Sequence, residues 1–172
     1  MPVTYNLIAS NTLSTTATSI SFTSIPNTYT DLVIRASLRG DNAFAFSNLQ
    51  LRFNGSSATN YSYTRLLSDG ATPTSSRATA QAQLVVQYGV VAATSTSNTF
   101  SNVEIYIPNY NSSVNKVANA DAVHENNSAT AYLSANALLR SVTDAITSID
   151  LIVSANNFVS GSSFFLYGIK SS

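Results

Sequence analysis

Apolar and polar side chains alternate with a period of two along most of this chain. The segment 49–53, for example, reads Leu-Gln-Leu-Arg-Phe. Successive side chains of a β-strand point to opposite faces of a sheet, so this pattern predicts a strand with one buried and one solvated face. Similar alternation occurs at 19–23, 32–38, 61–63, 103–107, 149–153 and 164–169, and a more apolar strand is expected at 84–92.

Three further segments, 3–9, 114–123 and 129–139, predict strands less clearly. Turn-forming Gly, Asn and Pro residues separate the segments, as at Asn54-Gly55. Helical patterns are nearly absent, and 135–139 has room for one or two helical turns at most. About eight to ten short strands without intervening helices predict an all-β fold, an antiparallel β-sandwich of the jelly-roll-like kind.

No shift in composition divides the chain, so we expect a single β-sandwich domain over 19–172. The preceding segment, 1–18, is expected to form either a strand of the sandwich or an arm that reaches a neighbouring subunit. The segment 69–82 lacks alternation and predicts a long exposed loop. No signal peptide is visible at the N-terminus, and no apolar stretch is continuous enough to predict a transmembrane span.

Charged residues make up only 9% of the 172 residues, and the net charge is zero. Ordinary soluble domains carry about a quarter charged residues. Ser, Thr and Asn replace them, with 65 residues in all. A neutral chain cannot supply the electrostatic attraction that dominates binding to nucleic acids or to anionic membranes, so we expect neither partner.

The residues that catalyse reactions or bind metals are few. The chain has no cysteine and a single histidine, His124, so we expect no disulfide, no metal site and no cofactor. His124 precedes Glu125, but no Gly-x-Ser-x-Gly motif marks a nucleophile, and we interpret His124 as a surface residue beside the turn at 126–127. The aspartates are scattered near turns, so we expect no enzymatic activity.

Four tyrosines are the candidate contact surface. Tyr61 and Tyr63 share one face of a predicted strand, and Tyr106 and Tyr110 flank a proline. Such rings can form a platform that stacks on sugars or peptides, although alternate tyrosines also pack inside sandwiches. The tripeptide 39–41 reads Arg-Gly-Asp, an integrin-binding motif when it projects from a hairpin, but we interpret it as an ordinary turn.

Several short sequence segments, in a fixed order along the chain, resemble those of a known family. They lie at 21–26, 29–32, 51–55, 60–63, 105–110, 146–149, 157–158, 161–162 and 166–169. Together they resemble small β-sandwich virion proteins of tailed bacteriophages, which occur as capsid decoration proteins and in tail-fibre regions. The resemblance implies a structural protein without an active site, with turns at Pro26 and Gly55 and a final strand at 166–169.

From this resemblance we expect a decoration or cement protein on the capsid surface, which stabilises the head by binding the major capsid protein or other virion proteins. The alternative is a tail-fibre or receptor-binding module that recognises a host glycan or protein. A lectin or carbohydrate-active enzyme is a third interpretation. Sheet edges without lysine and a low charge favour an assembled state, so we also expect a homo-oligomer, a trimer or a dimer.

Overall fold

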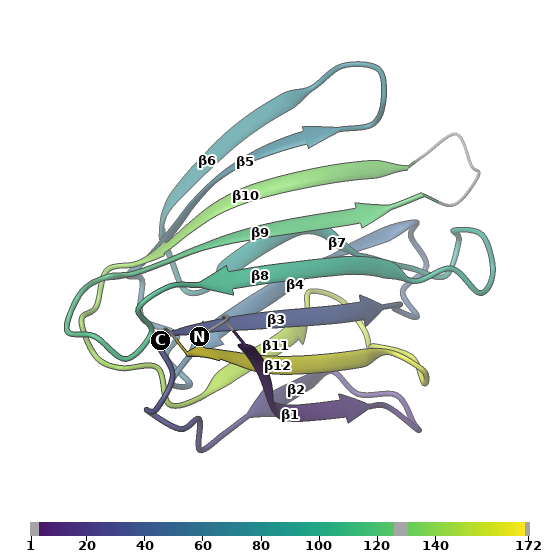
Figure 1. Ribbon diagram of the computed structural model, residues 1–172. Helices are drawn as coiled ribbons and strands as arrows, with labels where there is room; N and C mark the ends of the chain where they lie inside the picture. Colours follow the sequence, from purple (N-terminus) through teal and green to yellow (C-terminus); the bar gives the residue numbers. More distant parts are fainter. Residues whose placement is uncertain (1–3, 126–130, 171–172) are drawn as a thin grey trace.

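The computed structural model describes residues 4–125 and 131–170, which form two antiparallel β-sheets (Figure 1). The strands are β1 (Thr4–Thr12), β2 (Ser19–Phe22), β3 (Asp31–Leu38), β4 (Phe46–Phe53), β5 (Tyr61–Ser68), β6 (Thr74–Gln81), β7 (Leu84–Val91), β8 (Ser101–Ile107), β9 (Lys116–His124), β10 (Tyr132–Arg140), β11 (Ile149–Val153) and β12 (Ser163–Lys170). None of these described residues forms a helix, so none forms a helix that could cross a membrane.

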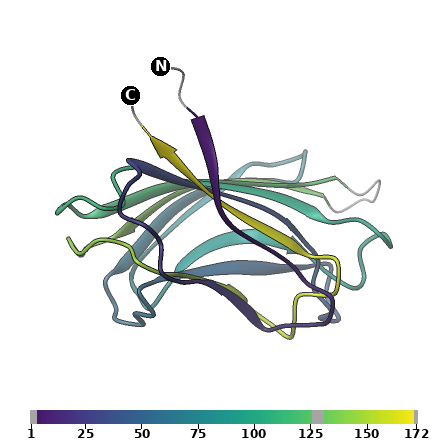
Figure 2. The same cartoon turned by 60° about the horizontal axis from the view of Figure 1, so that its bottom comes forward.

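The two sheets are unequal in size. The larger has eight strands in the order β1-β12-β3-β8-β9-β10-β5-β6, and the smaller has four in the order β2-β11-β4-β7. Figure 2 shows them as two stacked layers. The predicted all-β antiparallel sandwich is therefore confirmed, with 12 strands in the described parts of the chain instead of eight to ten.

The hydrophobic core lies between the two sheets. Buried and exposed residues alternate strictly along β9, and Ala120 faces the core from that strand. From the opposite sheet, β4 contributes Leu49, Leu51 and Phe53, all fully buried. Complete burial of one such side chain stabilises the fold by about 1.5–3 kcal/mol. The period-two pattern of the sequence is thus the pattern of inward and outward side chains.

The three less clear segments are also strands of the larger sheet. They contain β1, β9 and β10, although residues 126–130 lie outside the described part of the chain. Helical turns at 135–139 were the wrong expectation, because this segment belongs to β10. It is hydrogen-bonded to β9 on one side and to β5 on the other. Pairing on both edges outweighs the weak helical preference of its Ala and Leu residues.

A long loop at 69–82 was also the wrong expectation, since residues 74–81 form β6, which pairs with β5. β6 is an edge strand, and its residues are exposed on both faces except for the half-buried Ala78 and Gln81. A strand without a buried face needs no apolar residues in alternation. The sequence pattern therefore carried no signal for it.

Of the N-terminal segment, residues 4–12 form a strand of the larger sheet. β1 pairs with β12 along its whole length and forms the edge opposite β6 (Figure 1). The connection to β2 stays attached to the body, because the Leu13 N–H donates to the Ser162 carbonyl at 2.9 Å and the Ala17 N–H donates to the Phe158 carbonyl at 3.1 Å.

At one position of β12, Gly168, an aromatic ring lies so close to the backbone that only glycine fits. A Cβ atom on Gly168 would lie 2.3 Å from Cγ of the Tyr29 ring, far inside van der Waals contact. The ring of Tyr29 thus lies directly on the backbone of β12 and packs against the edge of the core. Any larger residue at position 168 must displace it.

We expect Gly168→Ala to lower the free energy of unfolding by about 1–3 kcal/mol, because the added methyl group overpacks this contact. Urea unfolding followed by circular dichroism measures the change. Gly40→Ala is the matched control, since its Cβ would meet its nearest neighbour, Val90, at an ordinary 3.4 Å. Equal losses in the two variants would contradict the assigned role of Gly168.

Candidate functional site

The four predicted contact tyrosines do not form one surface. Tyr61 and Tyr63 share a face, but it is the inner one, where they are 1% and 9% exposed. Tyr110 is buried as well, and its hydroxyl donates to the Pro26 carbonyl. Tyr106 alone lies on the outer face of the larger sheet, half-buried. The candidate contact surface is therefore wrong for three of its four residues, which pack in the core.

The Tyr106 hydroxyl donates to the Asp31 carboxylate at 2.8 Å, and this hydrogen bond raises the pKa of Tyr106. The contact ties β8 to the start of β3 across the outer face. The hydroxyl of Tyr106, the one partly accessible tyrosine of the four, is thus already engaged in a hydrogen bond within the protein.

The Arg-Gly-Asp tripeptide is held within the fold. The Arg39 guanidinium donates to the backbone carbonyls of Ser95, Thr96 and Thr99 at 2.8–3.2 Å. The Asp41 carboxylate accepts hydrogen bonds from the side chain and backbone N–H of Asn157, which lower the pKa of Asp41. Both charged groups thus fasten loops and do not project as an integrin-binding tip would.

His124 is a buried residue, and its interpretation as a surface histidine is wrong. It is 5% exposed, and its ring packs 4.2 Å from that of Phe46, beside Tyr88 and Tyr132. Neither ring nitrogen has a hydrogen-bond partner in the described protein. Burial lowers the pKa of His124 to about 4, against the opposing effect of Glu125. The imidazole is therefore neutral at pH 7.

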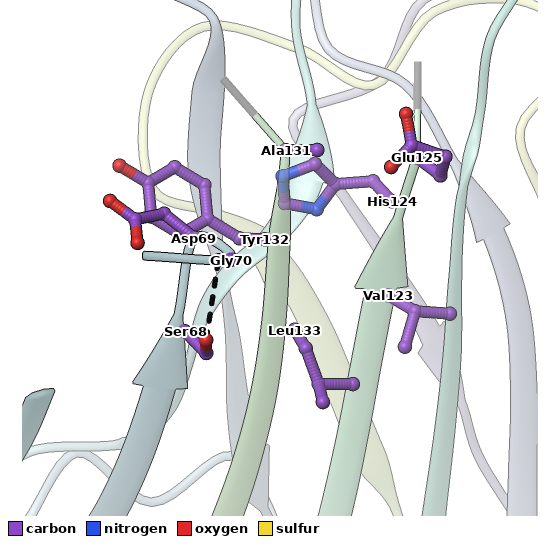
Figure 3. Close-up of a pocket in the computed structure, with 9 residues that line it drawn as sticks. All are labelled: Ser68, Asp69, Gly70, Val123, His124, Glu125, Ala131, Tyr132 and Leu133. Atoms are coloured by element: carbon purple, nitrogen blue, oxygen red, sulfur yellow. Dashed lines mark hydrogen bonds between the residues drawn. The ribbon is translucent and has the colours of Figure 1, made fainter. Parts of the chain in front are cut away.

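A hollow of about 360 Å³ opens beside His124. It lies where β5 and β9 end and β10 begins. Figure 3 shows the imidazole directed toward Ala131 and Tyr132. The hollow is also lined by Ser68, Asp69, Gly70, Val123, Glu125 and Leu133. Both imidazole nitrogens are shielded from solvent, so the ring offers no free nitrogen to a molecule in this hollow.

The acidic side chains serve mainly within the fold. Asp31 accepts from Tyr106, Asp144 pairs with Arg140 at 2.7 Å, and Asp150 accepts from the Ser21 hydroxyl at 2.6 Å. In the described ranges, no three His, Asp or Glu side chains are grouped so that they could hold a metal ion.

The outer face of the larger sheet is the extended surface that no described element covers. Two apolar patches lie at its opposite ends. The aromatic patch, on β1, β12 and β3, consists of Tyr5, Leu7, Arg35, Phe165 and Tyr167. The aliphatic patch, on β5, β9 and β10, consists of Leu66, Val117, Val123, Leu133, Ala135 and Ala137.

In the aromatic patch, the rings are held against one another. Tyr5 meets Tyr167 edge to face, with ring centroids 6.2 Å apart, and Phe165 stacks on Tyr167 at 6.5 Å. The Arg35 guanidinium lies 5.5 Å from the centroid of the Tyr5 ring. Tyr5 and Leu7 remain 49% and 55% exposed. Arg35 also forms an ion pair with the Glu104 carboxylate at 2.7 Å, so the patch presents ordered aromatic surface and a paired charge to the solvent.

The spacing of tyrosines in the sequence does not indicate this patch, because Tyr5 and Tyr167 meet only through the pairing of β1 with β12. The available signal was in 164–167, which reads Phe-Phe-Leu-Tyr. Phe164 and Leu166 are fully buried, so Phe165 and Tyr167 must point outward. A strand that is apolar on both faces carries more apolar surface than its core requires.

No protein-family model and no curated protein sequence matches the chain. Among solved structures, the chain is similar to the galectin LEC-6 of Caenorhabditis elegans. The TM-score is 0.37 and the identity is 8%, over 94% of this chain and 96% of the galectin chain. A likeness at this level has no bearing on function. The class that the structure itself defines is an all-β antiparallel sandwich of two sheets.

We expect His124 to make the stability of the fold depend on pH. Its pKa is depressed from 6.5 to about 4 in the folded state, so the unfolded chain binds the proton more readily. The contribution of neutral His124 to the free energy of unfolding is fully present above pH 6.5. It is lost as the pH falls toward 4, which lowers the free energy of unfolding by about 3 kcal/mol.

Chemical unfolding of the wild type and of His124→Phe at pH 7 and pH 4 measures this contribution. The phenylalanine keeps an aromatic ring in the cluster but cannot be protonated, so its variant should lose about 3 kcal/mol less than the wild type on acidification. The same loss in both proteins would show that His124 is not the titrating group.

Proposed function

We propose that this protein is a structural virion protein of a tailed bacteriophage, a capsid decoration protein that binds major capsid subunits through its aromatic patch. The sequence resemblance supplies the phage context. The structural observation that supports a binding role is the ordered group of exposed rings beside Arg35 at the edge of the larger sheet. This surface replaces the four tyrosines that the sequence singled out.

Tyr and Arg are enriched among the residues that dominate the energy of protein interfaces. Here they lie on a rigid support, since β1 and β12 are hydrogen-bonded along their length. Little conformational entropy remains to be lost when such side chains bind a partner. Most nearby outward residues of the sheet are uncharged, so covering them removes few charges from water.

A role without catalysis fits the same proposal. The single histidine is buried without a hydrogen-bond partner in the described protein, and Asp31, Asp41 and Asp144 are engaged in holding loops. Hydroxyl groups are plentiful, but no imidazole or thiolate is available to activate one.

The second candidate is a tail-fibre or receptor-binding module that recognises a host glycan or protein. The same exposed rings favour it, because Tyr5 and Tyr167 offer flat apolar faces on which sugar rings can stack. The location in the virion separates the two functions. Antibodies against the protein should label the capsid surface for a decoration protein, and the tail for a receptor-binding module.

We expect the double variant Tyr5→Ser, Leu7→Ser to bind capsids at least about tenfold more weakly than the wild type, since it removes the most exposed part of the aromatic patch. Heads from a phage that lacks the gene are mixed with purified protein, and cosedimentation gives the affinity. Circular dichroism verifies that the variant is folded.

Phe44→Ser is the matched control, because Phe44 is a large apolar residue that is 71% exposed, between β3 and β4 and outside the patch. It should bind as the wild type does. Equal binding by the double variant would exclude the aromatic patch as the contact. The capsid function itself would be excluded if the heads do not bind the protein and if heads that lack it resist heat as well as complete heads do.

A further inference from the structure

The aliphatic patch lies at the other end of the larger sheet and is separate from the surface in the proposed function. Four of its side chains are large and only half covered, with exposed fractions of 40–55%. They are Leu66, Val117, Val123 and Leu133. No described element of the chain packs on them. An apolar group of this kind on a folded protein marks a surface that another molecule covers.

The centre of the patch is hollow. The outward side chains of β10 are small there, Ala135 and Ala137, while the neighbouring strands carry larger ones. Leu66 of β5 lies directly opposite Ala135 in the sheet and forms a raised border. The resulting depression has a volume of about 410 Å³. The patch thus contains a ridge and a groove side by side, on adjacent strands.

Opposite charges stand on the two sides of this ridge and groove. Asp121 of β9 is paired with Ala135, and Arg77 of β6 is paired with Thr64, the β5 residue opposite Ala137. Both charged side chains are exposed. Across the sheet the order is therefore cation, ridge, groove, anion, on β6, β5, β10 and β9 in turn.

This order is complementary to itself, and we infer that the aliphatic patch binds a second copy of this chain, face to face, about a two-fold axis parallel to the strands between β5 and β10. That operation places β5 of each copy over β10 of the other, and β6 over β9. The Leu66 ridge then enters the partner's alanine groove. Arg77 lies over β9 of the other copy, level with Asn119 and two residues along the strand from Asp121.

A second copy fits this surface better than an unrelated partner because one symmetry operation satisfies both features at once. An isologous contact requires a self-complementary surface, and here both shape and charge are self-complementary. Two sheets that pack face to face lie about 10 Å apart, which is within reach of the long Arg77 side chain. The neutral chain adds no net repulsion between the copies.

The expected affinity follows from the size of the patch. Four strands spaced about 4.8 Å apart and four or five residues along each give a surface roughly 15–20 Å on a side. Two such surfaces together bury less than the roughly 1,200 Å² at which standard specific contacts begin, so a weak dimer with a dissociation constant of about 10–100 µM is expected. Such a dimer leaves the aromatic patch of each copy free.

Charge exchange tests the inferred arrangement. Sedimentation equilibrium over about 1–500 µM measures the dimer for the wild type, for Arg77→Asp, for Asp121→Arg and for the variant with both substitutions. Each single substitution places like charges across the axis and should weaken the dimer at least about tenfold. The double variant restores opposite charges and should dimerise within about threefold of the wild type.

A second pair of variants tests the apolar contact. Leu66→Ser should weaken the dimer at least about tenfold, while Val114→Ser should not, although both side chains are 52% exposed in the isolated chain. A wild type that stays monomeric at 500 µM, or a double charge variant that remains as weak as the single ones, would overturn the inference. The dimer test changes residues of the aliphatic patch, whereas the capsid-binding test changes residues of the aromatic patch. The inference and the proposed function can therefore fail independently of each other.

Discussion

The apolar contact between the inner faces of the two sheets is the interaction on which the rest of the structure depends. Strands from distant parts of the chain meet in each sheet, and only the burial of their inward side chains offsets the entropy lost in bringing them together. Leu32, Ile34 and Leu38 of β3 and Leu49 of β4 belong to one hydrophobic cluster and have no exposed surface. Because this inner layer is apolar, the outer faces are free to carry other residues.

The same apolar core explains how the few buried charged residues are arranged. Lys116 points inward from β9 and is 1% exposed, so burial lowers its pKa, and its ammonium donates to the carbonyls of Ser112 at 2.6 Å and Thr143 at 3.4 Å. Arg140, at the paired end of β10, binds Asp144. These contacts hold the loops at this end of the sandwich. His124, at the opposite end of β9, avoids the cost of a buried charge by staying neutral.

The unequal size of the sheets leaves the surfaces that concern function. The smaller sheet packs on one face of the larger sheet, and no strand of the described part of the chain packs on the other face. Its two ends differ in chemistry, with ordered rings beside Arg35 at one end and aliphatic side chains around an alanine groove at the other. One rigid sheet can therefore hold two separate contact surfaces in fixed relation to each other.

The sequence by itself determined the class of fold, because period-two alternation is a local pattern that each strand with one buried face must show. It also identified most strands, and it missed β6 because an uncovered strand has no such pattern. Which face was buried was decided only by the tertiary structure. Tyr61 and Tyr63 alternate correctly, yet the same alternation fits an inward or an outward pair.

The surfaces themselves also required the tertiary structure. Tyr5 and Tyr167 are far apart in the sequence and meet because β1 pairs with β12. Arg77 and Asp121 lie on opposite sides of one groove because β5 and β10 come between their strands. Pairing between distant strands depends on the whole sheet order, which no local pattern of residues specifies.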